Sequence, residues 1–261
     1  MDDANGCWRL TTPINEDNEI ERVSKSIQLF LKRLKDIPDW KTRTSRVEPI
    51  VHGFGISSGG HLLAQLATDP SYGLTEVIHA IHIQIAAPLL KPKKLWSRIP
   101  VAFTVMERDW NIKSSIKRIA TLVESYHVPI KIYETKSKLI TRNYFRSRIP
   151  NLSKSLSGAI YNDLLKNNVI NKKGELLINP KDLDHGIGPL SIYVHGGKRK
   201  PPQMSDDLLR ILTYDELSRS QLVWISEELN VAWNQHEISF DSFHDVLIWL
   251  SKQNEWIPPI V

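Results

Sequence analysis

Four short apolar runs, separated by longer amphipathic or polar stretches, restrict the folds that are open to this chain. They cover residues 47–54, 77–86, 100–106 and 128–133. Strands that are buried on both faces are apolar almost throughout, whereas half-exposed strands alternate between apolar and polar residues. Because helical segments separate the runs, the sequence predicts an α/β fold with a mostly parallel sheet flanked by helices.

Apolar residues recur at spacings of three and four in the stretches beside these runs. Such spacing gathers the apolar side chains on one face of a helix. The sequence therefore predicts helices over residues 13–38, 58–68, 114–126 and 240–250.

The middle of the chain has a different character. Residues 141–225 include a predicted helix at 153–166 and a loop rich in Gly, Pro and Asp, but no alternation of strands and helices. We expect residues 141–225 to form a helical insertion or lid, and residues 1–140 and 226–261 to form the α/β core.

The composition is that of an ordinary globular protein, with 41% hydrophobic and 24% charged residues. The formal net charge is +5, but the basic residues form small groups among acidic ones and do not align with aromatic residues. We therefore expect no nucleic-acid partner. Cys7 is the only cysteine, which rules out an internal disulfide and a multi-cysteine metal site.

Two features bear on location. No stretch of eighteen apolar residues occurs, so we expect no membrane span. The first six residues, MDDANG, are acidic and polar, unlike a secretory signal. Together these features favour a cytoplasmic location.

Gly55-Ile56-Ser57-Ser58-Gly59 matches the pattern G-x-S-x-G and lies between a predicted strand and a predicted helix. A serine on such a tight turn can act as a nucleophile, because the turn lifts its hydroxyl above the sheet. The helix that follows directs its N-terminal N–H groups toward the turn, where they can bind an oxyanion, and the Ser58 N–H is the first donor.

Two other interpretations of this segment remain. It could simply link a strand to a helix, or it could hold a phosphate. The lysine of a Walker motif and the G-x-G-x-x-G spacing are both missing, so phosphate binding is the weaker alternative.

The segment from Pro49 to Ala67, PIVHGFGISSGGHLLAQLA, resembles the nucleophile elbow of α/β-hydrolase-fold proteins, the superfamily of serine esterases, lipases and peptidases. The resemblance implies a catalytic triad in the order serine, acid, histidine. The chain departs from the family before the elbow, where it offers one helix and one short predicted strand at residues 8–12 instead of several strands.

The resemblance places the acid at Asp109, directly after the second predicted strand beyond the elbow. A carboxylate there can accept a hydrogen bond from an imidazole and stabilise its protonated form. Glu107 is a nearby substitute, and Asp109 could instead only cap the helix that follows it.

The resemblance places the base at His236, on a loop before the last helix. There it would take the proton of Ser57 and return it to the leaving group. An ordinary cap or surface histidine is the structural alternative. The other histidines are in less suitable places: His52, His79 and His82 in or beside strands, His61 and His244 in helices, His127 before a strand, and His185 and His195 in the insertion.

The expected function is that of a serine hydrolase that cleaves an ester, thioester or amide bond of a small acyl substrate, without cofactor or metal. The alternative is a catalytically inactive hydrolase-fold protein with a binding or interaction role. The missing N-terminal strands support it, because the loop that donates the second oxyanion N–H would be lost with them. An uncovered sheet edge would also favour self-association.

Overall fold

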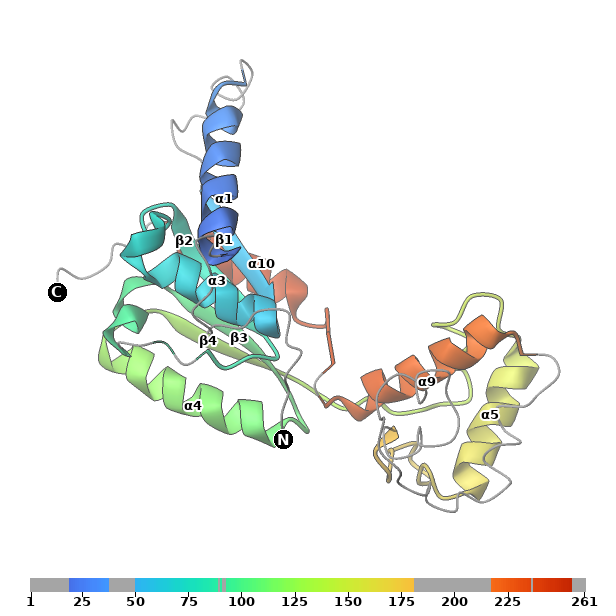
Figure 1. Ribbon diagram of the computed structural model, residues 1–261. Coiled ribbons are helices and arrows are strands. Elements are labelled where there is room, and N and C mark those ends of the chain that lie inside the picture. The colour runs from blue at the N-terminus through green and yellow to red at the C-terminus, as the bar shows by residue number, and fades with distance from the viewer. Residues whose placement is uncertain are drawn as a thin grey trace, which may run out of the picture. The chain divides into compact units, whose positions relative to one another are not determined.

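The computed structural model describes residues 19–37, 50–88, 90, 93–180, 217–235 and 237–254, and the chain divides into two compact units (Figure 1). The first unit comprises Met1–Val105, Asp109–Thr135 and Ile238–Val261. The second comprises Met106–Arg108 and Lys136–Glu237. The predicted strand at residues 8–12 lies outside the described residues.

The first unit contains a four-stranded sheet whose strands lie side by side in sequence order: β1 (Val51–Ile56), β2 (Ile78–Gln84), β3 (Val101–Met106) and β4 (Ile130–Thr135). β1 runs parallel to β2 with Gly55 opposite Ile83, and β2 runs parallel to β3 with Ile81 opposite Val101. The predicted α/β class with a parallel sheet is thereby confirmed.

One face of the sheet packs against α3 (Ser58–Thr68), α4 (Trp110–Ser125) and the 3-10 helix η2 (Lys93–Arg98). Leu66, Trp96 and Ile116, one from each of these helices, share a buried core with Ile83 and Phe103 of the strands. The partly buried apolar side chains of α1 (Glu19–Lys35) pack against this core as well. A short 3-10 helix, η1 (Pro70–Tyr72), follows α3.

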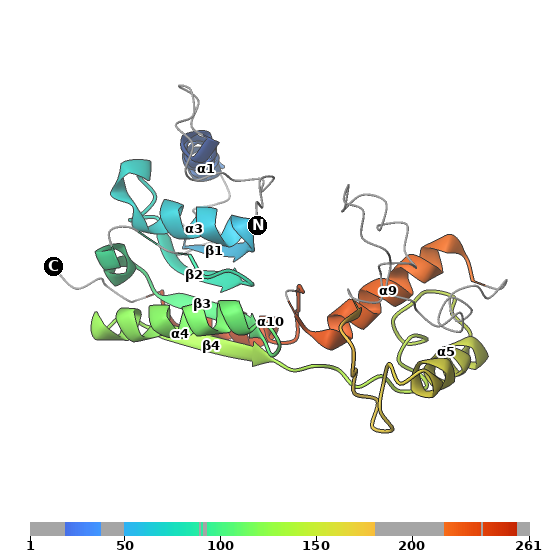
Figure 2. The same cartoon turned by 60° about the horizontal axis from the view of Figure 1, so that its bottom comes forward.

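The opposite face of the sheet packs against α10 (Phe243–Ser251), which lies behind the sheet in Figure 1. Val246 and Leu250 of this helix contact Ala80 of β2. Successive side chains of a strand point to opposite faces, so Ile81 and Ile83 face α3 and α4. Helices therefore cover both faces of the strands, as seen along the sheet in Figure 2.

The helix α4 begins four residues earlier than the sequence predicts. We expected it at residue 114, but it begins at Trp110, because Asp109 is its N-cap and accepts a hydrogen bond from the Ile112 N–H at 3.2 Å. Polar residues at 111, 113 and 114 occupy the first turn. A cap of this kind satisfies one of the backbone donors that a helix start leaves open.

The second unit has its own buried core, to which α5 (Lys154–Lys166) and α9 (Arg219–Trp233) contribute. Phe145, Ile160 and Ile225 are among its fully buried side chains. An antiparallel bridge joins Ile170 to Leu176. Within the described part of the chain, no helix is long and apolar enough to cross a bilayer.

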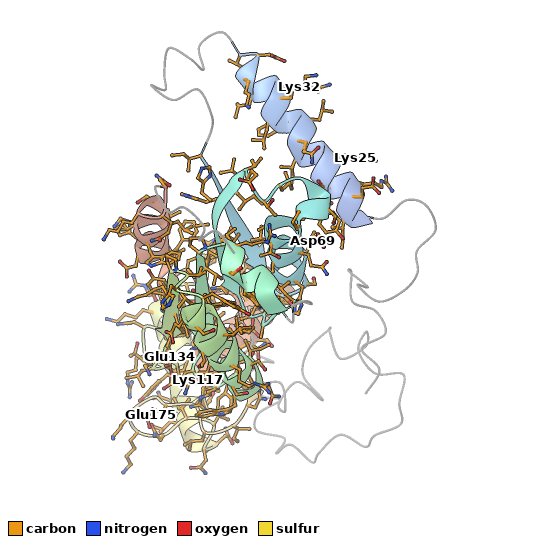
Figure 3. All side chains as sticks on the ribbon, turned by 90° about the vertical axis from the view of Figure 1, so that its left-hand side faces the viewer. Lys25, Lys32, Asp69, Lys117, Glu134 and Glu175 are labelled. Atoms are coloured by element: carbon orange, nitrogen blue, oxygen red, sulfur yellow. The ribbon has the colours of Figure 1, made fainter. Side chains whose placement is uncertain are left out.

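The charged side chains that Figure 3 labels project from the surface of their elements, among them Lys25 and Lys32 on α1 and Lys117 on α4. All three lysines are exposed. Exposed charges of this kind are solvated and contribute little to the stability of the fold.

Candidate active site

Ser57 occupies the single residue between the end of β1 and the start of α3, and its backbone is strained. Its φ is 51° and its ψ is −123°, a conformation that L-residues avoid and that costs of order 1–3 kcal/mol. Its N–H donates to the carbonyl oxygen of Gln84 at 2.9 Å, and its own carbonyl accepts from the Gly60 N–H at 2.9 Å. The turn is therefore held from both sides.

Two glycines make this tight turn possible. A Cβ on Gly55 would lie 2.7 Å from Cα of Gly60, and one on Gly60 would lie 2.7 Å from Cγ2 of Ile83. A Cβ on Gly59 would meet nothing within 4 Å. The close approach of α3 to the ends of β1 and β2 thus depends on Gly55 and Gly60, whereas the last glycine of the sequence pattern, Gly59, has no steric role.

The side chain of Ser57 is partly exposed, and it makes no capping hydrogen bond to α3. The first residue of that helix is Ser58. The N–H groups of a first helical turn have no partners within the helix and carry a partial positive charge. The hydroxyl of Ser57 and these donors therefore belong to the same turn.

A second strained residue, Ile85, lies directly after β2. Its φ is 48°, its side chain is 5% exposed, and its N–H donates to the carbonyl of Thr104 at 3.3 Å. A positive φ is rare for a β-branched residue. A strained residue thus directly follows each of β1 and β2, and such residues cluster at functional sites. The positive φ of Ile85 could not be predicted, because isoleucine favours the extended conformation of a strand.

Asp109 is buried, with 7% of its surface exposed, and its carboxylate caps α4. The capping role that we considered as an alternative to catalysis is therefore present.

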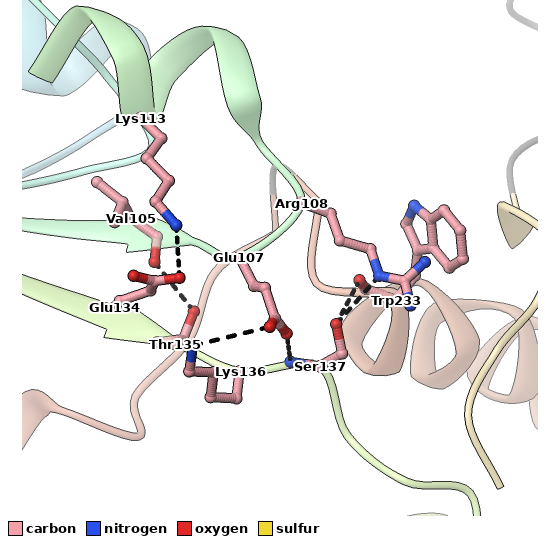
Figure 4. Close-up of polar contacts among 9 residues, drawn as sticks. All are labelled: Val105, Glu107, Arg108, Lys113, Glu134, Thr135, Lys136, Ser137 and Trp233. Carbon is pink, nitrogen blue, oxygen red and sulfur yellow. Dashed lines mark hydrogen bonds and ion pairs between the residues drawn. The ribbon is translucent and has the colours of Figure 1, made fainter. Parts of the chain in front are cut away.

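Glu107, the substitute for Asp109, is engaged elsewhere (Figure 4). Its Oε2 accepts a hydrogen bond from the Ser137 N–H at 2.8 Å, and its Oε1 lies 3.7 Å from Nζ of Lys136. The Ser137 N–H is the main reason why the pKa of Glu107 is lowered. Both oxygens thus hold the end of β3 to the segment that follows β4.

Arg108 ties the residues before Asp109 to the end of α9. Its guanidinium lies 3.6 Å from the centroid of the Trp233 ring, and its Nε donates to the Ser137 hydroxyl at 3.1 Å (Figure 4). Its backbone N–H donates to the carbonyl of Asn234 at 3.2 Å. Asn234 ends α9 in a left-handed conformation with φ of 58°.

His236 lies outside the described residues, as do the fallback histidines His185 and His195. Residues on both sides of His236 are described. Asn234 accepts the hydrogen bond from Arg108, and the carbonyl of Ser239 accepts one from Nε2 of Gln84 at 2.6 Å.

Two histidines of the strands have structural partners. His82 lies with its Nε2 2.8 Å from Oγ1 of Thr104, and burial lowers its pKa to about 4. His52 lies 3.0 Å from Oδ1 of Asn254, and burial is the main cause that lowers its pKa. Both contacts agree with the interpretation of these residues as packed histidines.

The other described histidines lie in or beside the elements expected for them, and one of these is His79 in β2. His61 is in α3, where burial lowers its pKa. His127 follows α4 with φ of 55°, and His244 is exposed on α10. Among the described residues, no group of three His, Cys, Asp or Glu side chains could hold a metal ion.

No family model, no curated protein and no solved structure matches this chain.

Proposed function

We propose that this protein is a serine hydrolase of the α/β-hydrolase type, which cleaves an ester, thioester or amide bond of a small acyl substrate. The observation that carries the proposal is the backbone of Ser57, with φ of 51° at a strand–turn–helix junction. A serine that only linked β1 to α3 would need no strained conformation. Strain of this kind persists where it presents a reactive group, and a nucleophile elbow has this arrangement.

In the proposed reaction, the hydroxyl oxygen of Ser57 attacks the acyl carbon, and its proton passes to His236. The developing oxyanion accepts a hydrogen bond from the Ser58 N–H at the start of α3. The protonated imidazole then gives its proton to the leaving group, and water releases the acyl group by the same steps.

The contact at Ser239 supports the role of His236. Ser239 is bonded to the side chain of Gln84, whose carbonyl is bonded to the Ser57 N–H. Ser239, three positions after the proposed base in the sequence, is thus tied to the residue that holds the proposed nucleophile.

The acid of the proposed triad is Asp109, the residue to which the resemblance to hydrolases gives this role. Glu107 uses both carboxylate oxygens in contacts with Ser137 and Lys136. In the proposal Asp109 orients His236 and stabilises its protonated form.

The remaining parts of the earlier expectation belong to the same proposal. We propose that residues 141–225 serve as the insertion or lid of a hydrolase-type core and shape the access of substrate. No cofactor takes part in the proposed reaction, because serine, histidine and aspartate together supply the nucleophile and the proton transfers.

Reaction with a fluorophosphonate probe tests the proposal, because such probes phosphonylate activated serines. We expect labelling of the folded protein at Ser57, loss of labelling in Ser57→Ala, and a large reduction in His236→Ala. Folded wild-type protein that stays unlabelled over hours would contradict the proposal and favour the inactive binding protein. Circular dichroism of each variant provides the control for folding.

A further inference from the structure

One edge of the sheet is formed by β1, and no described strand pairs with its outer side. The Ser57 N–H at the end of this strand donates to Gln84 of β2, which shows which side of the strand faces the sheet. Backbone groups point to opposite sides at successive residues, so those of His52, Phe54 and Ile56 point out of the edge. A row of outward-pointing donors and acceptors is a template for another strand.

Exposed apolar side chains lie beside this edge, on the face of the sheet that α10 covers. Phe54 is 41% exposed, and its ring centroid lies 5.5 Å from that of Phe243. The ring centroid of Phe243 lies 5.9 Å from that of Phe240, which is 66% exposed. Leu247, one turn further along α10, is 48% exposed. We call these residues the edge patch, and contiguous apolar patches of this kind mark interaction surfaces.

The two edges of the sheet differ in charge. β4, at the opposite edge, carries the exposed charged residues Lys131 and Glu134. β1 contains neither a charged carboxylate or amine nor a proline, and burial lowers the pKa of His52, which is therefore uncharged at neutral pH. Natural edge strands use charges and prolines to prevent pairing with other chains. β4 thus has this protection and β1 lacks it.

We propose that β1 pairs with β1 of a second copy of this chain, antiparallel and about a twofold axis at Phe54, so that the two sheets become continuous. In this register Phe54 opposes the same residue of the second copy, and His52 opposes Ile56. Each pair exchanges both of its N–H···O=C hydrogen bonds. The inference does not depend on the proposed hydrolase function, because the edge patch takes no part in that reaction.

Register and charge favour a second copy as the partner. A twofold interface uses the same surface on both subunits, so that surface has to match itself. Phe54 is the middle one of the outward-pointing residues, so pairing about it satisfies His52 and Ile56 as well. No charge faces a like charge across the axis. The axis is perpendicular to the sheet, so the two edge patches lie on the same face and become neighbours.

A charge exchange at Phe54 tests this register. We expect wild-type protein to sediment as a dimer at high concentration and as a monomer after dilution. Phe54→Lys and Phe54→Glu should each be monomeric, because like charges then oppose each other across the axis, and an equal mixture of the two should form dimers. The matched control is Ile132→Lys in β4, which places the same charge on the opposite edge and should leave dimers intact.

Several results would overturn the inference. Wild-type protein that stays monomeric over a hundredfold range of concentration would do so, and is expected if another segment of the same chain, such as residues 8–12, covers the edge. Dimers that persist in Phe54→Lys, a monomeric mixture of the two variants, or an equal loss in Ile132→Lys would also contradict it. Circular dichroism checks the folding of each variant. If the Phe54 variants do not fold, Phe240→Lys on the exposed patch should raise the dissociation constant at least tenfold.

Hydrogen exchange locates the contact without any substitution. The amides of His52, Phe54 and Ile56 should exchange at least tenfold more slowly at a concentration that favours the dimer than after dilution. The amides of β3, which lie inside the sheet in both states, should not change. Exchange in β1 that is independent of concentration would overturn the inference even if dimers form.

Discussion

The N–H of Ser57 and the carbonyl of Gln84 are joined by a hydrogen bond of 2.9 Å, which fixes the turn after β1 to the end of β2. The register of the two strands continues to this point, since Ile56 pairs with Gln84. The hydrogen bond to the end of β2 therefore holds the backbone of Ser57 against the sheet. The free energy of the strain at Ser57 can therefore be measured by comparing variants of this residue.

Ser57→Gly should be more stable than Ser57→Ala by about 1 kcal/mol, although both lack the hydroxyl. Glycine adopts φ of 51° without strain, whereas alanine retains the clash of its Cβ. Chemical denaturation of the two variants measures the difference. Equal stabilities would show that the strain at this position is absent, and would remove the main support for the nucleophile elbow.

Asp109→Asn should separate catalysis from helix capping. Asparagine can still accept the hydrogen bond from the Ile112 N–H, so the free energy of unfolding should change by less than about 1 kcal/mol. It cannot stabilise a protonated imidazole, so the rate of Ser57 labelling should fall by about 10²–10⁴.

Glu107→Gln provides the matched control for Asp109→Asn. Its amide oxygen can still accept from Ser137, and we expect labelling at the wild-type rate. A large loss in Glu107→Gln with normal labelling of Asp109→Asn would exchange the roles that we assign to the two carboxylates.

Gly55→Ala and Gly59→Ala test which glycines shape the turn. The Cβ of the first would lie 2.8 Å from the carbonyl oxygen of Gly59, a backbone atom that cannot move cheaply. We expect Gly55→Ala to destabilise the fold by about 1–3 kcal/mol. Gly59→Ala adds a Cβ in open space within α3 and should be neutral, or stabilising by up to about 1 kcal/mol. Thermal melting measures both variants, and equal losses of stability in Gly55→Ala and Gly59→Ala would contradict this expectation.

The burial of His82 predicts a loss of stability in acid. Its pKa is lowered to about 4 in the fold, from 6.5 for the free side chain, so between these values the unfolded chain binds more protons than the native one. Stability should therefore rise with pH between pH 4 and 6.5, by at most about 3 kcal/mol from this residue.

His82→Phe removes this titration and keeps a ring beside Phe54. The hydroxyl of Thr104 retains Ser242 as a partner in that variant. The difference in unfolding free energy between wild type and His82→Phe should change with pH only in that window. A difference that is constant from pH 4 to 7 would contradict the burial of a neutral imidazole.

The parallel sheet and the strand–turn–helix junction could be predicted from the sequence, because they depend on local patterns. The runs of isoleucine and valine in β2 and β3, and the change of period after Ser57, mark these elements directly. The start of α4 lies four residues before the predicted one, because the Asp109 side chain caps a first turn that is mostly polar.

The contacts that hold the candidate site together could not be predicted. Gln84 and Ser239 are 155 residues apart, and no local pattern connects them. The left-handed conformation of Ile85 contradicts the preference of its own residue type, because the surrounding sheet determines it. The steric role of Gly60 could not be predicted either, because the pattern G-x-S-x-G contains Gly59 and not Gly60.

The docking of α10 on the sheet has a consequence for the order of folding. The Tyr133 hydroxyl donates to the carbonyl of Asp245, 112 residues further along the chain. Closing a flexible loop of that length costs about 4 kcal/mol in its length-dependent part alone. If the second unit, with its own core, forms first, the loop is effectively shorter and the cost falls. We therefore expect the last helix to gain protection late in refolding, after the hydrophobic core around α5 and α9 has formed.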